Sequence, residues 1–168
     1  ATTDIYTLSL HDALPICSAI VAMHNLGYDG EIIAVNPRYD DIMGHRCVAS
    51  IADLPPEVDA AMLNVPADAA VEALEACATK GIKAIVLVAQ GFGEAGGKGL
   101  ERDARVISAA QAHGLAVTGP NTNGLANVRN GQALAIAPVY QFAGRVVPGS
   151  VALVSQSGAM VSTILAQP

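Results

Sequence analysis

Four short apolar runs, each followed at once by turn-forming residues, recur along the middle of this 168-residue chain. They read EIIAV, DAAMLNV, KAIVLVA and LAVT, at 31–35, 59–65, 83–89 and 115–118. Successive runs are mostly about 25–30 residues apart, the size of a strand-helix-strand unit. Strands that alternate with helices at this spacing form a parallel sheet with right-handed crossovers. The pattern therefore predicts an α/β fold with a doubly wound parallel sheet.

Helix-length segments accompany these runs at 18–26, 67–80 and 100–113. Each is followed directly by a glycine, a residue that commonly ends helices. In the segment at 67–80 we expect the buried stripe to consist of Val71, Leu74 and Cys77. In the segment at 100–113 we expect it to consist of Leu100, Ala104, Ile107 and Ala110.

The composition fits a sheet that is covered on both faces. Hydrophobic residues make up 52% of the chain and charged residues 14%, while aromatics supply only 4%. The core must therefore be packed by Ala, Val, Ile and Leu, as in a buried parallel sheet. The net charge of −6 argues against a nucleic-acid partner, which needs a basic surface. No apolar run approaches the roughly 20 residues that span a bilayer, so we expect no membrane association.

The three cysteines, Cys17, Cys47 and Cys77, show no paired spacing of the kind that metal sites use. An odd set of this kind suggests reduced thiols and a cytoplasmic protein. We therefore predict no metal site, and we expect Cys77 to be a packing residue.

Residues 1–16, ATTDIYTLSLHDALPI, do not share the pattern of the rest. The stretch TLSLHDALPI resembles the translation of a sequencing adapter, so we expect residues 1–16 to be non-native and exclude them from the fold. The alternative is a native strand at 5–10. His11 and Asp12 receive no functional weight on either interpretation.

The pattern changes after Asn127. Residues 128–150 contain several glycines and prolines and no helix-length pattern, which predicts an excursion or hairpin that leads out of the first domain. A new apolar strand is expected at 151–154, a turn at 155–158 and a helix at 159–166. We interpret these as the start of a second domain and expect truncation at this end too.

Ligands of open parallel sheets bind beyond the carboxyl ends of the strands. The third run is followed by a literal G-x-G-x-x-G motif at 91–96. A dinucleotide-binding loop belongs on the first strand-to-helix turn, however, and Glu94 would face the phosphates. No acidic residue follows the next strand to bind a ribose, since that position reads Gly119-Pro120-Asn121. A loop that lines a neighbouring groove explains the motif better.

Arg38 follows the first run in Asn36-Pro37-Arg38. Arginine at this strand tip suits a phosphate on a ribose, whereas NAD-binding domains carry an acidic residue there. Coenzyme A (CoA) and NADP both carry such a phosphate, so both remain open. A solvated surface arginine is the third interpretation.

Taken in order, the segments GYDGEIIAVNPR, NVPAD, AQGFGEAG, GPNTNGLANV and VALVSQSGA resemble the NDP-forming acyl-CoA synthetases. These include ADP-forming acetate–CoA ligases and the α subunit of succinyl-CoA synthetase. The resemblance covers nearly all of 18–168. It implies a Rossmann-type CoA-binding domain at 17–127, a connection at 128–150, and at 151–168 the incomplete start of a flavodoxin-like α/β domain.

The resemblance also implies which residues bind ligands. Residues expected to contact CoA, from the adenosine phosphate to the thiol end, are Asn36, Pro37, Arg38, Val65, Pro66, Val88, Ala89, Gln90, Gly91 and Asn121. At the start of the last helix, those expected to face a phosphohistidine are Ser155, Ser157 and Gly158. That histidine has no counterpart among His24, His45 and His113, so we predict no catalytic residue in this chain.

The sequence departs from this family at two places. The segment at 1–16 stands where the family has its first strand and a Gly-rich phosphate loop. Thr122 and Asn123 stand where relatives often carry Cys and a hydrophobic residue or Pro.

The whole ligase would interconvert acyl-CoA, ADP and phosphate with carboxylate, CoA and ATP. ATP, ADP and Mg²⁺ would bind an ATP-grasp domain or subunit absent here, so we expect this fragment to be inactive. An NADP-binding oxidoreductase domain and a stand-alone CoA-binding regulatory protein are the alternatives.

Overall fold

The computed structural model describes residues 5–8, 14–141 and 146–167. Within them a seven-stranded sheet has the order β3-β4-β2-β1-β5-β6-β7. Its strands are β1 (Ile5–Leu8), β2 (Ile32–Val35), β3 (Asp41–Ile42), β4 (His45–Val48), β5 (Ala60–Leu63), β6 (Ala84–Leu87) and β7 (Ala116–Thr118). All neighbouring strands run parallel except β3 and β4, which are antiparallel. The expected doubly wound α/β class is confirmed.

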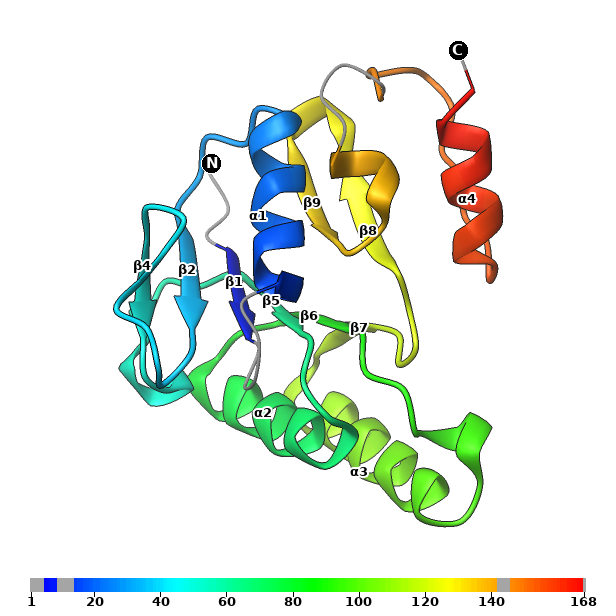
Figure 1. Ribbon diagram of the computed structural model, residues 1–168. Helices are drawn as coiled ribbons and strands as arrows, with labels where there is room; N and C mark the ends of the chain where they lie inside the picture. Colours follow the sequence, from blue (N-terminus) through cyan, green and yellow to red (C-terminus); the bar gives the residue numbers. More distant parts are fainter. Residues whose placement is uncertain (1–4, 9–13, 142–145, 168) are drawn as a thin grey trace.

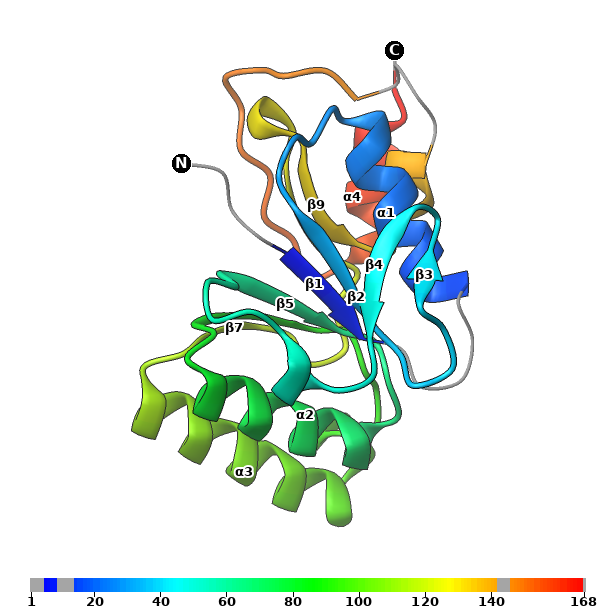
Figure 2. The same ribbon diagram turned by 90° about the vertical axis from the view of Figure 1, so that its left-hand side faces the viewer.

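Helices cover both faces of the sheet (Figure 1). α2 (Ala67–Lys80) and α3 (Lys98–His113) cover one face. On the other lie α1 (Leu14–Asn25), the 3-10 turn η4 (Pro138–Gln141) and the antiparallel hairpin of β8 (Gly124–Asn127) and β9 (Gln132–Ala135). Figure 2 shows the sheet between these two layers. Burial on both faces explains why the strands are apolar throughout.

Consecutive residues of the central strands alternate between two separate cores. Ile33 and Leu63 belong to the core under α2 and α3, while Ala34 and Met62 belong to the core under α1. All four of these residues are completely buried. The sequence pattern thus places a core on each face of β2 and β5.

α2 begins and ends where the sequence predicts. Pro66 precedes its first turn, and Gly81 ends it with φ +93°, donating its N–H to the carbonyl oxygens of Cys77 and Ala78. A left-handed residue at this position satisfies carbonyls that the last helical turn leaves without partners. Cys77 is fully buried, which confirms its expected packing role.

The exclusion of residues 1–16 from the fold was wrong for 5–8 and 14–16. Residues 5–8 form β1, which pairs in parallel with β2 on one side and β5 on the other. α1 begins at Leu14, four residues before its expected start, and Ile16 is completely buried. The physical reason is that a parallel sheet needs a strand between β2 and β5, and IYTL has the length and β-forming residues to fill that place. The adapter origin of the segment stays a prediction.

The predicted buried stripe of α3 was also wrong. Leu100 and Ile107 are 60% and 55% exposed, whereas Val106 is 6% exposed and Gly99 is buried. A side chain at Gly99 would collide with the backbone carbonyl of Phe92, which is itself fully buried. This close approach sets the rotation of α3, so its glycine side faces inward in place of its most apolar side.

Residues after β7 only partly match the expectation. A hairpin forms, but earlier than the excursion or hairpin expected at 128–150: β8 lies wholly before that range, and only β9 falls within it. No strand forms at 151–154, where Val151 and Val154 are 88% and 96% exposed. An isolated strand has no ladder to stabilise it, and no described strand pairs with this segment. The expected last helix is present as α4 (Gly158–Leu165).

None of the helices formed by the described residues has both the length and the apolar character needed to span a bilayer.

Candidate functional site

The exits of the parallel strands meet at one edge of the sheet. β2 and β5 lie on opposite sides of β1, so the winding direction reverses beside β1. Such a reversal creates a crevice at the carboxyl ends of the strands, where ligands of open α/β sheets bind. The residues expected to contact CoA follow β2, β5, β6 and β7. They therefore lie along this edge, as the parallel pattern predicts.

The exit of β2 is a tight turn built on Asn36. This residue is completely buried, and its backbone N–H donates to the carbonyl oxygen of Val48 at 3.0 Å. Its side-chain Oδ1 accepts a hydrogen bond from the backbone N–H of Arg38 at 2.9 Å. Pro37 and Arg38 are exposed. Asn36 therefore positions the turn, while Arg38 is the residue of the three whose charged side chain is accessible to a ligand.

Hydrogen bonds join the exits of β5, β6 and β7. The N–H of Val88 donates to Leu63 at 3.0 Å, and the N–H of Asn121 donates to Ala89 at 2.9 Å. The ladder therefore continues past the ends of the strands and holds the three exits side by side. Val65, Val88 and Ala89 are buried, whereas Pro66 and Gln90 are exposed.

The loop at 91–96 is closed by its own side chains. The N–H of Gly91 donates to Glu94 Oε1 at 2.6 Å, and the carbonyl oxygen of Gly91 accepts from Arg102 Nη1 at 2.7 Å. Arg102 also forms an ion pair of 2.7 Å with Asp68 at the start of α2. The hydrogen bond from Gly91 lowers the pKa of Glu94, which keeps this carboxylate charged. A pyrophosphate at this loop would meet a carboxylate where it needs a donor.

Two glycines of the loop region are there for packing. A side chain at Gly93 would collide with the carboxylate of Asp103, and one at Gly99 would collide with the carbonyl of Phe92. The glycine spacing is thus explained by contacts between this loop and α3. The interpretation of the motif as a neighbouring loop, and not a dinucleotide-binding turn, agrees with these contacts.

A cavity of about 650 Å³ lies between the turn after β7 and the start of α4. Of the expected site residues, Asn121, Ser155 and Gly158 line it. A side chain at Gly158 would collide with the amide of Asn123, so the loop and the helix start are in close contact. Segments more than 30 residues apart in the sequence are thereby brought together at one polar cavity. Ser157 caps α4 just outside this lining, and the remaining expected residues lie along the strand exits.

The start of α4 is capped by its own serines. Ser157 Oγ accepts from the N–H of Met160 at 3.3 Å, and the N–H of Ser157 donates to Ser155 Oγ at 3.0 Å. Helix N-termini carry partial positive charge that favours anions. The cavity therefore combines this charge with hydroxyl and amide groups.

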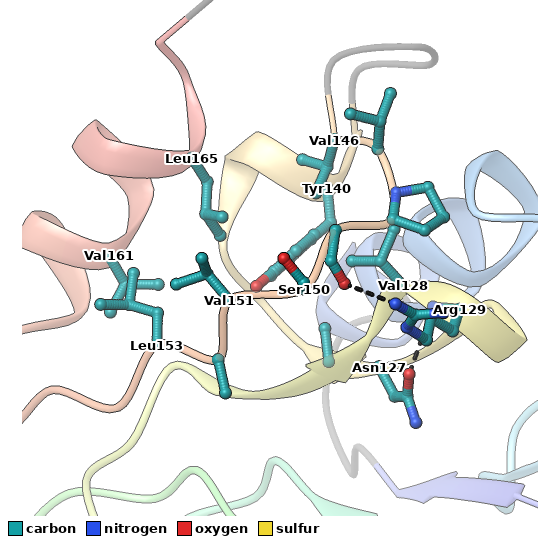
Figure 3. A pocket seen from close by; sticks show the side chains of 15 residues that line it. Asn127, Val128, Arg129, Tyr140, Val146, Ser150, Val151, Leu153, Val161 and Leu165 are labelled. Carbon is teal, nitrogen blue, oxygen red and sulfur yellow. Dashed lines mark hydrogen bonds between the residues drawn. The ribbon is translucent and has the colours of Figure 1, made fainter.

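A second cavity, of about 540 Å³, was not anticipated from the sequence (Figure 3). It lies between the end of β8, residues 146–153 and α4, and Arg129 spans its rim by donating from Nη2 to the carbonyl oxygen of Gly149 at 2.9 Å. Tyr140 lines both cavities, and burial raises the pKa of its hydroxyl. The one sequence signal for Tyr140 was its rarity, as an aromatic residue in a chain with few of them.

No group of three or more His, Cys, Asp or Glu residues suited to a metal ion occurs within 5–8, 14–141 and 146–167.

Comparison with known proteins identifies the family. The model of the CoA binding domain family matches residues 18–127, well over half of the chain. Acetate–CoA ligase [ADP-forming] II of Archaeoglobus fulgidus is 40% identical over 141 residues, which cover 83% of this chain and 20% of that protein. The α subunit of acetate–CoA ligase [ADP-forming] II of Pyrococcus furiosus is 31% identical over 81% of this chain and 28% of its own length.

A solved structure shows the same fold. It is that of the dinucleotide forming acetyl-coenzyme A synthetase 1 of Ca. Korarchaeum cryptofilum in complex with phosphate and ADP. The TM-score is 0.85 at 27% identity, over 97% of this chain and 34% of that one. The present chain thus spans about a fifth to a third of the length of these relatives. The chain belongs to the CoA binding domain family, and its homologues are ADP-forming acetyl-CoA synthetases.

Proposed function

We propose that this domain binds CoA as the substrate-binding part of an ADP-forming acid–CoA ligase. The whole ligase would interconvert acyl-CoA, ADP and phosphate with carboxylate, CoA and ATP. The observation that carries the proposal is the convergence of four parallel strand exits on one edge of the sheet, in a chain of the CoA binding domain family. Arginine, and not an acid, is the first charged residue after β2, which suits the 3′-phosphate of CoA.

Each exit would contact a different part of the ligand. The Asn36 turn would present Arg38 to the adenosine 3′-phosphate. Val65 and Pro66 would border the adenine, and residues 88–91 would follow the pantetheine arm. Because Val65, Val88 and Ala89 are buried, their contribution would come from backbone groups and small exposed edges. Asn121 would lie near the thiol end.

The cavity of about 650 Å³ at the start of α4 would hold a phosphate group that takes part in the reaction. Ser155, Gly158 and Asn121 supply hydroxyl, backbone and amide groups at a helix N-terminus that carries roughly half a positive charge. A phosphate group suits this setting. ATP, ADP and Mg²⁺ would bind an ATP-grasp domain or partner subunit of the ligase. The three free cysteines support our proposal of a cytoplasmic protein.

Titration calorimetry with CoA, NADP⁺ and NAD⁺ tests the proposal. We expect weak binding of CoA that is still tighter than that of either dinucleotide. Binding should be weak because residues 9–13, SLHDA, contain no glycine where the family has its phosphate loop. Tighter binding of NADP⁺ than of CoA would favour the oxidoreductase alternative, which the contact between Glu94 and Gly91 already argues against.

A ligand lacking one phosphate sharpens the test. A hydrogen bond to a charged group contributes about 1.5–3 kcal/mol, so Arg38→Glu should weaken CoA binding about tenfold or more. The same substitution should hardly change binding of 3′-dephospho-CoA, because its target is missing. Arg46→Glu is the matched control: Arg46 is an exposed arginine on β4, and its replacement should leave both ligands unaffected. If Arg38→Glu weakened the binding of CoA and of 3′-dephospho-CoA equally, the assignment of Arg38 to the 3′-phosphate would be contradicted.

A further inference from the structure

A pair of histidines lies at the other edge of the sheet, where the strands begin. His24 is in the last turn of α1, and His45 is the first residue of β4. Their Nε2 atoms are 2.8 Å apart, and the ring centroids are 5.0 Å apart with the rings tilted by 37°. α1 runs antiparallel to β1, so its C-terminal end lies away from the strand exits (Figure 1). The pair is therefore separate from the candidate CoA site.

The surroundings of the pair fix His45 more firmly than His24. His45 is half-buried on β4, whereas His24 is exposed, and their Nε2 atoms lie within hydrogen-bonding distance of each other. The neutral form of the imidazole ring binds metal ions through its ring nitrogen.

We propose that His24 and His45 form a two-imidazole site for a borderline divalent transition-metal ion of the Zn²⁺, Ni²⁺ and Cu²⁺ class. Imidazole nitrogens bind such ions at about 2.0–2.1 Å, which puts two tetrahedral ligands about 3.4 Å apart. For tetrahedral Zn²⁺ the present separation must then widen by about half an ångström, whereas the right-angled ligands of Ni²⁺ or Cu²⁺ need almost no change. His24 is exposed, so a small side-chain rotation provides this change. Since no third protein ligand of the described residues joins the pair, water completes the coordination.

Nickel binding to the whole chain tests the proposal. The probe is NiCl₂ in a non-chelating buffer with a phosphine reductant, followed by titration calorimetry. We expect one ion per chain, with binding at least tenfold weaker in His24→Gln and in His45→Gln. The double variant should bind no more than twofold weaker than either single variant, because two chelating ligands act as a unit. Affinity within twofold of the native chain in either single variant would overturn the proposal.

The other candidate ligands provide the controls. His113→Gln and His11→Gln remove the remaining histidines, and Cys47→Ser removes the thiol two residues from His45. All three should bind Ni²⁺ as the native chain does, and loss in any of them would assign the ion elsewhere. Ni²⁺ should also raise the melting temperature of the native chain, since binding to the folded state stabilises it, but not that of His24→Gln. CoA affinity should be unchanged in His24→Gln, so the outcome is independent of the proposed function.

Discussion

The carboxylate of Glu94 accepts a 2.6 Å hydrogen bond from the backbone N–H of Gly91, so a loop with phosphate-loop spacing is closed by its own acid. The amide that a pyrophosphate would use is already engaged. Arg102 holds the carbonyl of the same residue from α3. The loop is thus a fixed wall beside the β6 exit.

Low pH should break the hydrogen bond between the Gly91 N–H and the Glu94 carboxylate. The hydrogen bond from Gly91 lowers the pKa of Glu94, so the contact contributes at neutral pH and is lost as the pH falls through this lowered value. We expect the amide signal of Gly91 in nuclear magnetic resonance spectra to titrate below the usual range of a glutamate. Glu94→Gln should abolish that titration, whereas Glu101→Gln, at an exposed site in the first turn of α3, should leave it unchanged. A pH-independent Gly91 signal in the native chain would contradict the assignment.

Gly119 should tolerate no side chain. It has φ +105°, and a Cβ there would collide with the carbonyl oxygen of Leu87 at the end of β6. Gly114 provides the matched control, since its φ is +64° but a Cβ would meet nothing within 4 Å. We expect Gly114→Ala to cost about 1–2 kcal/mol, the usual penalty of a left-handed residue. Gly119→Ala should cost clearly more in urea unfolding, and equal costs would show that the collision is relieved by small shifts.

The rotation of α3 can be tested in the same way. Val106→Ala removes buried methyl groups and should lower the free energy of unfolding by about 2 kcal/mol. Ile107→Ala, one residue along on the exposed side, should change it by no more than about 0.5 kcal/mol. A larger loss of stability in Ile107→Ala than in Val106→Ala would instead support the buried stripe of α3 that the sequence pattern predicts.

Features of the fold that neighbouring residues determine were predictable from the sequence, whereas those that distant contacts determine were not. The bounds of α2 were predictable because Pro66 and Gly81 act on their immediate neighbours. The strands were predictable because burial on both faces leaves a continuous apolar run. The rotation of α3 depends on contact between Gly99 and Phe92, and the place of β1 depends on two strands far along the chain. Neither relationship is visible in a local pattern.

In the candidate site, too, some features were predictable from the sequence and others depend on contacts between distant residues. Convergence of the strand exits follows from parallel pairing and was predictable. The turn in which Asn36 is buried and Arg38 exposed depends on a backbone contact with Val48 on the next strand. The place of Tyr140 between two cavities depends on how an irregular segment folds back over the hairpin. Packing over long sequence separations decided both.

The thiols should differ in reactivity. Cys77 is completely buried and should resist iodoacetamide in the native chain. Burial raises the pKa of Cys47, so its thiolate, and with it the alkylation rate, should become significant only above the usual pH range of a cysteine. Mass spectrometry after timed alkylation from pH 7 to 10 measures this, with Cys47→Ser identifying the modified peptide. Rapid modification of Cys47 at pH 7 would contradict the raised pKa.

Mapping by amide chemical shifts would locate the CoA site directly. If CoA lies across the strand exits, its addition should shift the backbone amides of Arg38, Gln90 and Asn121 together. These residues follow three different strands, and the hydrogen bond from Asn121 to Ala89 places two of the exits side by side. The amides of His24 and His45, at the opposite edge, should stay unchanged and serve as the internal control. Because 3′-dephospho-CoA lacks the phosphate assigned to Arg38, it should shift Gln90 and Asn121 while the change at Arg38 shrinks. Shifts confined to the loop at 91–96 would instead place the ligand on the side of the sheet that faces α3.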